Sequence, residues 1–357
     1  MWLSLVEGLG PRGMHALLSG LGSPAAVLNA SAATLERYVP GNLARAIKSG
    51  GDAAEAGLIL DWGRVPGNHL IAWDDPDYPK MLLDTADAPP LLYYKGRREL
   101  LNKPALAIVG SRNASPSGLR TAEEFAEALA AAGLAIVSGL AQGIDAAAHR
   151  GALRAGVCGA STIAVIGTGV DRIYPPANRD LARQIAGEGG MLSEFPLGTP
   201  PLAANFPKRN ALISGLARGV LVVEAALGSG SLITARLAGE QGREVFAIPG
   251  SIHSPFSKGC HRLIRDGAKL VETAQDILEE LRWPVAGPIA PSKVYATDNG
   301  NDASGALLAA LGHDPLTTDE LCARLGWPVG RVSALLIELE LAGRVAQMPG
   351  GRLQRLG

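Results

Sequence analysis

The stretch Leu106-Ala107-Ile108-Val109-Gly110-Ser111-Arg112 places an uninterrupted apolar run directly before a glycine, a serine and an arginine. A short aliphatic run without polar alternation is typical of a parallel strand that is covered on both faces. Beyond the turn, Ser115-Pro116-Ser117-Gly118 opens a helical pattern over residues 119–132. Strand, small-residue turn and helix form a geometry that presents backbone N–H groups to an anion, and the arginine adds a planar cation. We therefore predict a phosphate-binding turn after this strand.

Six further apolar runs follow along the chain, and helical patterns separate them. The runs cover residues 134–137, 163–166, 191–193, 220–224, 244–248 and 269–271. Strands that alternate with helices predict a doubly wound, mostly parallel α/β sheet of the Rossmann-like class, with right-handed crossovers. In such a sheet the loops at the carboxyl ends of the strands form the binding site.

Smaller parts flank this region. Residues 1–68 predict a small SAM-like domain of short helices, and residues 69–283 hold the predicted sheet. The turn at residues 8–13 resembles a helix-hairpin-helix, whose backbone amides can bind a DNA phosphate. We favour a tight turn in a small helical bundle, because the pattern is short. Residues 284–303 are rich in proline, glycine and asparagine and predict a linker.

Residues 304–357 resemble a winged helix. Helical patterns at residues 306–311, 319–325 and 328–342 precede a short hairpin. The segment balances five basic against five acidic residues, namely Arg324, Arg331, Arg344, Arg352 and Arg355 against Asp314, Asp319, Glu320, Glu338 and Glu340. Because a DNA-reading helix-turn-helix usually carries a basic face, we favour a protein contact, with DNA contact as the alternative.

The composition limits the classes of function. With 357 residues and a net charge of −1, the chain fits two or three domains and is no polycation, so nucleic-acid binding needs a local basic pocket. Aromatic residues make up 4%, which argues against a broad base-stacking platform. Cys158, Cys260 and Cys322 show neither disulfide nor metal spacing, which favours a cytoplasmic protein. We find no apolar segment of membrane-spanning length and no secretory signal, so we predict no membrane association.

Five segments rich in small residues fall at predicted loop positions of the sheet domain, and two of them carry cations. The predicted phosphate-binding residues are Gly110, Ser111, Arg112, Ser138, Gly139, Gly167, Thr168, Lys208, Arg209, Asn210, Gly228, Ser229, Gly230, Ser231 and Thr234. Their N–H groups, hydroxyls and cations predict a concave anion-binding surface. The G-x-G-x-x-G and P-loop motifs are absent, so we predict no nucleotide cofactor and no metal.

Some side chains suited to catalysis have simpler interpretations. Asp145 and His149 are four residues apart and share a helix face, so they could form an acid–base pair or half of a metal site. We favour a simpler interpretation, in which Asp145 caps its helix and His149 packs or forms a local hydrogen bond. Glu224 lies at the end of a predicted strand. It could be a catalytic acid, but we favour a role as the partner of a helix terminus or of an arginine. Cys260 and His261 are adjacent and point in different directions, with no second cysteine nearby.

Nine motifs in order along residues 105–275 resemble the DNA processing protein A (DprA/Smf) family. They are the segments around Gly110, Ser138 and Ser229 together with Tyr174-Pro175, Ser193-Glu194, Phe206-Pro207-x-Arg209-Asn210, Val223-Glu224-Ala225, Ile248-Pro249-Gly250 and Gly259-Cys260. The helical start and the winged-helix end also resemble the longer members of this family.

The resemblance implies a Rossmann-like domain that binds single-stranded DNA, protects it and loads the RecA recombinase onto it during natural transformation. It implies no catalytic turnover, and it implies a homodimer through the α/β domains. Arg112 and residues 208–210 would grip the DNA backbone, while Ala211 stands where the family often has another arginine. The main alternative is a nucleoside-monophosphate phosphoribohydrolase that uses Glu224, and a third is a small-nucleotide sensor with the winged helix as its output.

Overall fold

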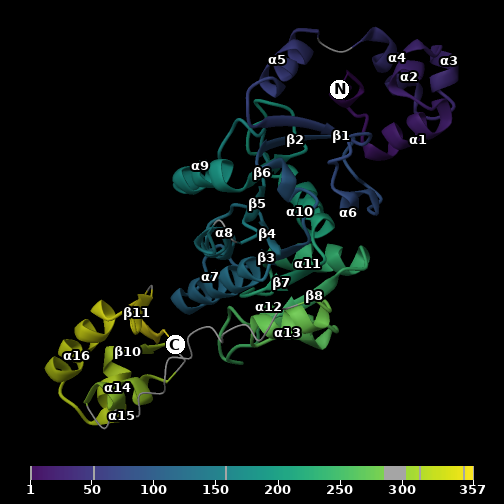
Figure 1. Ribbon diagram of the computed structural model, residues 1–357. Coiled ribbons are helices and arrows are strands. Elements are labelled where there is room, and N and C mark those ends of the chain that lie inside the picture. Colours follow the sequence, from purple (N-terminus) through teal and green to yellow (C-terminus); the bar gives the residue numbers. More distant parts are fainter. Residues whose placement is uncertain are drawn as a thin grey trace.

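The computed structural model describes residues 2–50, 53–156, 159–284, 303–312, 315–348 and 350–356. Within these ranges the chain forms a helical N-terminal part, a central sheet with helices on both faces, and a small C-terminal part (Figure 1). The predicted linker lies outside the described residues except for its two end residues, and so does Cys158. Among the described residues, no helix is both long and apolar enough to span a bilayer.

The central sheet has nine strands in the order β1-β2-β6-β5-β4-β3-β7-β8-β9. Their bounds are β1 (Asn68–Ala72), β2 (Leu91–Gly96), β3 (Ala105–Val109), β4 (Ala135–Ser138), β5 (Thr162–Val165), β6 (Gly190–Ser193), β7 (Gly219–Val222), β8 (Glu244–Ala247) and β9 (Lys269–Leu270). The seven strands from β3 to β9 are parallel, whereas β1 and β2 run antiparallel at one edge. The predicted Rossmann-like class is confirmed, with all seven predicted strands within two residues, and β1 and β2 are the strands that the sequence analysis missed.

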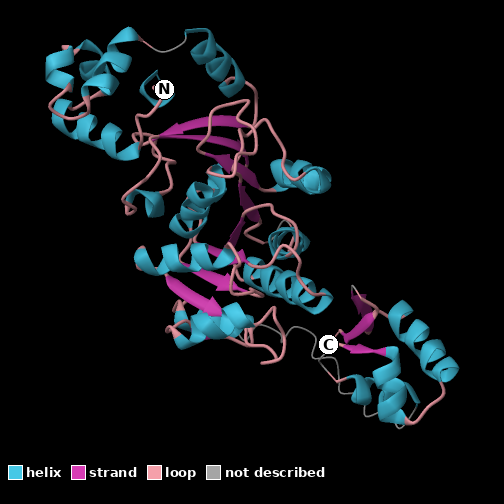
Figure 2. Cartoon of the chain, turned by 180° about the vertical axis from the view of Figure 1, so that it is seen from behind, coloured by secondary structure: helices cyan, strands magenta, loops and turns pink. Residues whose placement is uncertain are grey.

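Helices cover both faces of this sheet because successive residues of each strand point to opposite sides (Figure 2). Leu106 and Ile108 of β3 pack on one side with residues of α7 and α8, while Ala107 and Val109 pack on the other side with α10 and α11. The helix bounds are α5 (Ala53–Gly63), α6 (Lys80–Leu83), α7 (Pro116–Ala131), α8 (Ile144–Arg154), α9 (Arg179–Glu188), α10 (Asn205–Leu216), α11 (Ser231–Glu240), α12 (Lys258–Arg265) and α13 (Ala274–Glu280), with 3-10 turns η2 (Arg98–Leu100) and η3 (Pro176–Asn178).

The strand order changes direction between β3 and β7. Strands β3, β4, β5 and β6 follow one another toward one edge, and β7, β8 and β9 follow one another toward the opposite edge. The loops after β3 and β7 therefore leave a crevice between them, which is where doubly wound sheets bind their ligands.

The N-terminal part is a small helical bundle. Its elements are η1 (Trp2–Leu5), α1 (Pro11–Leu21), α2 (Pro24–Asn29), α3 (Ala32–Leu35) and α4 (Gly41–Ser49). Leu17, Leu35 and Ile47 are buried in its core. Gly10 caps α1 and Pro11 opens it, and only a 3-10 turn precedes them among the described residues. This arrangement favours the tight turn in a helical bundle over a helix-hairpin-helix.

The C-terminal part confirms the predicted winged helix. It consists of α14 (Ala303–Leu311), β10 (Leu316–Thr317), α15 (Thr318–Leu325), α16 (Val329–Leu341), β11 (Val345–Met348) and β12 (Arg352–Arg355), with strand order β10-β12-β11. A capping box between Thr317 and Glu320 starts α15. The β12 side contacts the sheet domain, since Gln354 Oε1 accepts a hydrogen bond of 3.3 Å from the Ser117 N–H of α7.

Candidate nucleic-acid interface

A groove of about 640 Å³ opens at the crevice between β3 and β7. Its walls come from the turn after β3, the start of α8, the first turns of α10 and the loop that leads into α11. The structure brings ten of the predicted site residues together here, namely Gly110, Ser111, Arg112, Arg209, Asn210, Gly228, Ser229, Gly230, Ser231 and Thr234. The segments that supply them are far apart in the sequence and meet because the parallel strands end at one edge.

The other predicted site residues do not line this groove. The hydroxyls of Ser138 and Thr168 are buried and donate hydrogen bonds of 2.6 Å and 2.7 Å to the carbonyls of Ile108 and Arg172. Both hydroxyls therefore hold the loops rather than face a ligand. Lys208 is exposed on the surface of α10, outside the groove lining.

Gly139 and Gly167 are needed for space rather than for binding. A Cβ at Gly139 would overlap the Nη1 atom of Arg209. A Cβ at Gly167 would lie 3.2 Å from the ring of Phe206. These two glycines therefore let the first turn of α10 approach the ends of β4 and β5.

Residues 206–210 belong to this first turn of α10, which corrects their predicted place in a loop. Arg209 is consequently only 4% exposed, and its Nη1 lies 3.7 Å from Oδ2 of Asp145. Asp145 also accepts a hydrogen bond of 3.2 Å from the N–H of Gly139. Burial raises the pKa of Asp145, and the Arg209 guanidinium opposes that shift. Arg209 thus joins α10 to α8 and forms the floor of the groove.

Arg112 differs from Arg209 because it is exposed at the groove wall. Its guanidinium carbon lies 5.8 Å from the centre of the Phe206 ring, and that of Arg209 lies 5.9 Å away. Tyr174 adds a second ring at 6.0 Å from Phe206. Sequence reasoning missed this aromatic pair, of which Phe206 lines the groove, although both rings belong to the motifs that carry the family resemblance.

Glu224 determines the shape of the turn that carries Arg112. Its backbone carbonyl accepts a hydrogen bond of 2.7 Å from the Ser111 N–H. Its carboxylate accepts one of 2.9 Å from the Ser115 N–H and one of 2.6 Å from the Ser115 hydroxyl. A Cβ at Gly118 would overlap this carboxylate. Glu224 therefore holds both ends of the turn, and its interpretation as the partner of a helix terminus is confirmed.

This contact corrects the expectation that α7 receives an external anion. The Glu224 carboxylate already occupies the N-terminus of α7, where the helix dipole and free N–H groups favour negative charge. Burial raises the pKa of Glu224, and its hydrogen bonds with Ser115 oppose the shift. The start of α11 lines the groove instead, with the Ser229 and Ser231 hydroxyls 2.7 Å apart. Its first N–H groups bond to Ser229 and Gly230 within the turn, so the hydroxyls are the groups it offers to a ligand.

His149 shows no arrangement for acid–base chemistry. Its Nδ1 lies 2.7 Å from the Thr162 hydroxyl, and the side chain is fully buried. Burial lowers its pKa to about 3, with the nearby Arg209 charge acting in the same direction, so the imidazole is neutral near pH 7. The structure thus supports the local role that we favoured for His149. The helix cap predicted for Asp145 is wrong, because α8 has Gly143 as its N-cap and Asp145 instead accepts from the N–H groups of Gly139 and Ala141. No three His, Cys, Asp or Glu side chains within the described ranges are grouped so that they could hold a metal ion.

The fold and this groove define a class of protein: a Rossmann-like sheet with an arginine at its crevice, followed by a winged helix. A family model for DNA recombination-mediator protein A matches residues 69–282, and a model for the DprA winged helix domain matches residues 291–351. The chain belongs to the DprA/Smf family.

Known relatives agree with this assignment. Protein Smf of Escherichia coli is 48% identical over 303 residues, which cover 83% of this chain and 80% of the relative. DNA processing protein DprA of Streptococcus pneumoniae is 51% identical over 229 residues, which cover 64% of this chain and 79% of the relative. Its X-ray structure superposes with a TM-score of 0.69 at 40% identity, covering 78% of this chain and 95% of the other.

A second solved structure is DNA processing protein A of Helicobacter pylori, described for its single-stranded DNA binding mode. It superposes with a TM-score of 0.54 at 31% identity, and the match covers 60% of this chain and 95% of the other.

Proposed function

We propose that this protein binds the phosphate backbone of single-stranded DNA in the groove between the turn after β3 and the start of α11. The observation that carries this proposal is the position of Arg112, an exposed cation on the groove wall. The Glu224 carboxylate bonds to Ser115 and leaves the Arg112 guanidinium available to a ligand. The Helicobacter pylori relative, described for binding single-stranded DNA, supports the same ligand for this chain.

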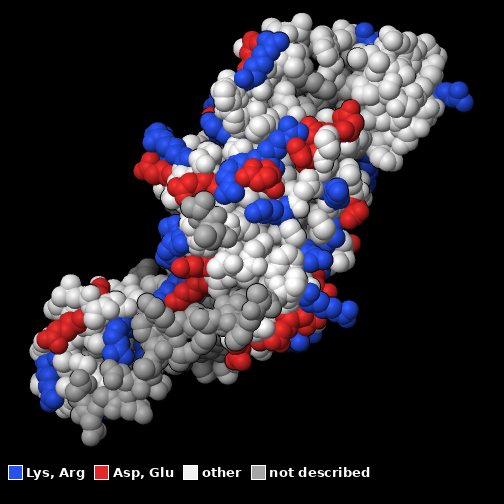
Figure 3. All heavy atoms as spheres, viewed as in Figure 1, with Lys and Arg blue, Asp and Glu red and all other residues white. Residues whose placement is uncertain are grey.

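The groove suits a single strand better than a duplex. A single strand exposes its bases, which can stack on rings such as Phe206 and Tyr174, while its phosphates meet cations. Basic and acidic side chains are interspersed on the face seen in Figure 3 and form no continuous basic stripe there. A duplex that relied on a broad electrostatic footprint would find little support on this face.

The predicted residues take different parts in this proposal. Arg112 contacts a phosphate directly, and Asn210, Ser229, Ser231 and Thr234 offer polar groups along the groove. Arg209 supports the groove from below. Gly110 allows the turn to pack against Ile144 and the Glu224 carbonyl, whereas a Cβ at Gly228 or Gly230 would meet open space. Lys208 adds an outer contact on the path of the strand as it leaves the groove.

We extend the proposal to the family's role in recombination, in which the protein protects incoming DNA and loads RecA onto it during natural transformation. This part rests on family membership and on the groove's fit to a bare strand. It involves no catalytic turnover. The nucleotide-hydrolase alternative loses support, because the Glu224 carboxylate it would use is held by Ser115.

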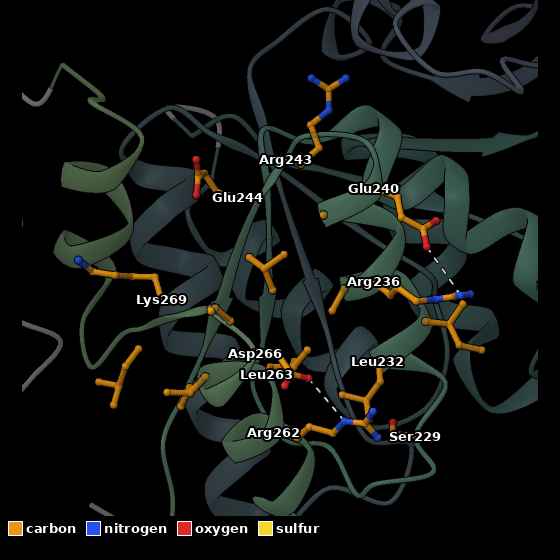
Figure 4. Close-up of a pocket in the computed structure, with 18 of the residues that line it drawn as sticks. Ser229, Leu232, Arg236, Glu240, Arg243, Glu244, Arg262, Leu263, Asp266 and Lys269 are labelled. Atoms are coloured by element: carbon orange, nitrogen blue, oxygen red, sulfur yellow. Dashed lines mark ion pairs between the residues drawn. The ribbon is translucent and has the colours of Figure 1, made fainter.

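A homodimer through the sheet domain is the second part of the proposal. A larger groove of about 1100 Å³ lies toward the β9 edge of the sheet, between α11, α12 and β9 (Figure 4). It adjoins the proposed DNA groove and shares Ser229 and Ile233 with it. Apolar side chains such as Leu232, Leu263 and Leu270 lie in it between ion pairs of Arg236 with Glu240 and Arg262 with Asp266. An exposed strand edge with apolar side chains is suited to a second copy.

Fluorescence anisotropy tests the first part with a labelled oligo-dT and a duplex of equal length at two or more salt concentrations. We expect tighter binding of the single strand, with log K falling by about 0.7 per contacted phosphate for each unit of log salt. Affinity that does not change with salt would contradict a phosphate groove. Strand exchange by RecA on DNA coated with a single-strand-binding protein then tests loading separately.

A further inference from the structure

The outer face of α16 carries an apolar stripe that the proposed DNA groove does not use. Val332, Leu336 and Leu339 are buried against the rest of the winged helix. The residues on the opposite face follow a spacing of four, three and four, as in a coiled-coil seam; they are Gly330, Ala334, Ile337 and Leu341. The side chains of Ile337 and Leu341 are 59% and 84% exposed.

Nothing else in the described chain covers this stripe. The winged helix contacts the sheet domain through its β12 side, where Gln354 meets Ser117 and Arg120 donates to the carbonyl of Leu356. In both ribbon views α16 lies on the side of the winged helix that faces away from the sheet domain (Figures 1 and 2). The charges beside the stripe include Glu338 and Glu340, which would repel DNA phosphates.

The order of side-chain sizes along the stripe fits a second α16 that runs in the opposite direction. Small residues come first, and large residues come last. In an antiparallel pair, Leu341 of one copy lies over Gly330 of the other, and Ile337 lies over Ala334. Each contact then occurs twice about a two-fold axis, as a symmetric interface requires. A parallel pair would instead place large residues against large ones and leave a gap between the small ones.

The charges have the same symmetry. Arg331 and Glu338 are seven residues apart and lie on one flank of the stripe. An antiparallel pair brings Arg331 of each copy beside Glu338 of the other copy. Arg331 already stacks on Trp327, with 4.2 Å from its guanidinium carbon to the ring centre, which holds it on this flank.

We infer that α16 pairs with α16 of a second copy in an antiparallel arrangement through this stripe and the two Arg331–Glu338 contacts. The interface is distinct from the proposed dimer contact of the sheet domain. Two different symmetric interfaces on one chain allow assemblies larger than a dimer. The stripe is short, so the pairing is weak in free solution and strengthens when copies are held close together on one DNA strand.

Sedimentation velocity of the full chain over a range of concentrations tests this inference, with and without a long oligo-dT. We expect the wild type to form larger assemblies as its concentration rises. The Ile337→Glu variant should form no species larger than the homodimer that the sheet domain makes. Val329→Glu is the matched control, because Val329 is equally exposed at 59% on the same helix but lies off the stripe. Circular dichroism checks that both variants keep their helices.

Charge reversal distinguishes self-pairing from other occupants of the stripe. Arg331→Glu and Glu338→Arg should each reduce assembly, and the double variant should restore it, because the reversed pair regains its partners. The inference would be overturned if Ile337→Glu assembled as the wild type does, or if the double variant assembled no further than the single variants. A Leu270→Glu change separates this interface from the sheet-domain dimer: α16 pairing should then persist as a dimer of single chains.

Discussion

Two helices begin beside the same crevice, and their N-termini are used differently. Both α7 and α11 follow a strand and start in a segment rich in serine and glycine. At α7 the Glu224 carboxylate occupies the N-terminus, whereas the start of α11 lines the open groove. A strand, a small-residue turn and a helix therefore define an anion site without saying whether the anion is a ligand or the protein's own side chain. Here one site fixes the turn, and the other lines the groove that we propose for DNA.

The largest expected effect concerns the floor beneath the open site. Asp145→Asn leaves the guanidinium of Arg209 buried without a charged partner, and breaking a buried pair in this way costs about 3–5 kcal/mol. Urea unfolding measures the loss. Asp180→Asn is the control, since Asp180 and Arg183 form an exposed pair of 3.2 Å whose removal should cost less than about 1 kcal/mol. Equal losses in the two variants would show that Arg209 does not depend on Asp145.

The half-buried carboxylate of Glu194 gives a contrast with that of Glu224, which is held at the start of α7. Burial raises the pKa of Glu194 to about 7 from 4.5, opposed by the charge of Lys208. Because the folded chain binds this proton more tightly than the unfolded chain, the contribution favours folding at low pH. It is lost as pH rises from about 4.5 to about 7, by up to about 3 kcal/mol. Chemical unfolding at several pH values should show this fall in the wild type and a flatter profile in Glu194→Gln.

Glu224→Gln removes the negative charge at the start of α7. The amide keeps the size of the side chain but loses the charge that receives the Ser115 N–H and hydroxyl, so the turn carrying Arg112 becomes less fixed. We expect single-stranded DNA binding to weaken by about 1–3 kcal/mol, the range for a buried polar group that loses its hydrogen-bond partner. Anisotropy measures it, with Glu188→Gln as the control, because Glu188 is exposed and lines neither groove.

A double variant tells whether Glu224 acts through the turn. If it does, Glu224→Gln adds little to the loss already caused by Arg112→Ala, because both changes remove the same contact. Fully additive losses would instead place the effect of Glu224 elsewhere in the molecule.

The smallest expected effect belongs to Lys208. Its side chain is exposed and lies outside the groove lining. Lys208→Ala should therefore weaken single-stranded DNA binding by less than about 1 kcal/mol, because an exposed charge is screened by water and salt. A salt titration by anisotropy gives both the affinity and the slope. A loss as large as that of Arg112→Ala would move the path of the strand onto the outer surface of α10.

Local sequence pattern predicted the parallel strands and the crevice, because buried parallel strands are short aliphatic runs and their ends define the site. It missed β1 and β2, which pair antiparallel at the sheet edge and do not alternate with long helices. It could not assign the two arginines, since the burial of Arg209 depends on the space at Gly139, 70 positions earlier in the chain. The contact of Ser115 with Glu224 spans 109 positions, beyond any local pattern.

The central claim, that single-stranded DNA binds in the groove at Arg112, is tested most directly by anisotropy with labelled oligo-dT on Arg112→Ala. Arg183→Ala is the matched control, because Arg183 is an exposed arginine on α9 with only an exposed partner. We predict a loss of about 1–3 kcal/mol for Arg112→Ala, which is roughly 5- to 150-fold in affinity, and no comparable loss for the control. Equal affinity of the two variants would contradict the account.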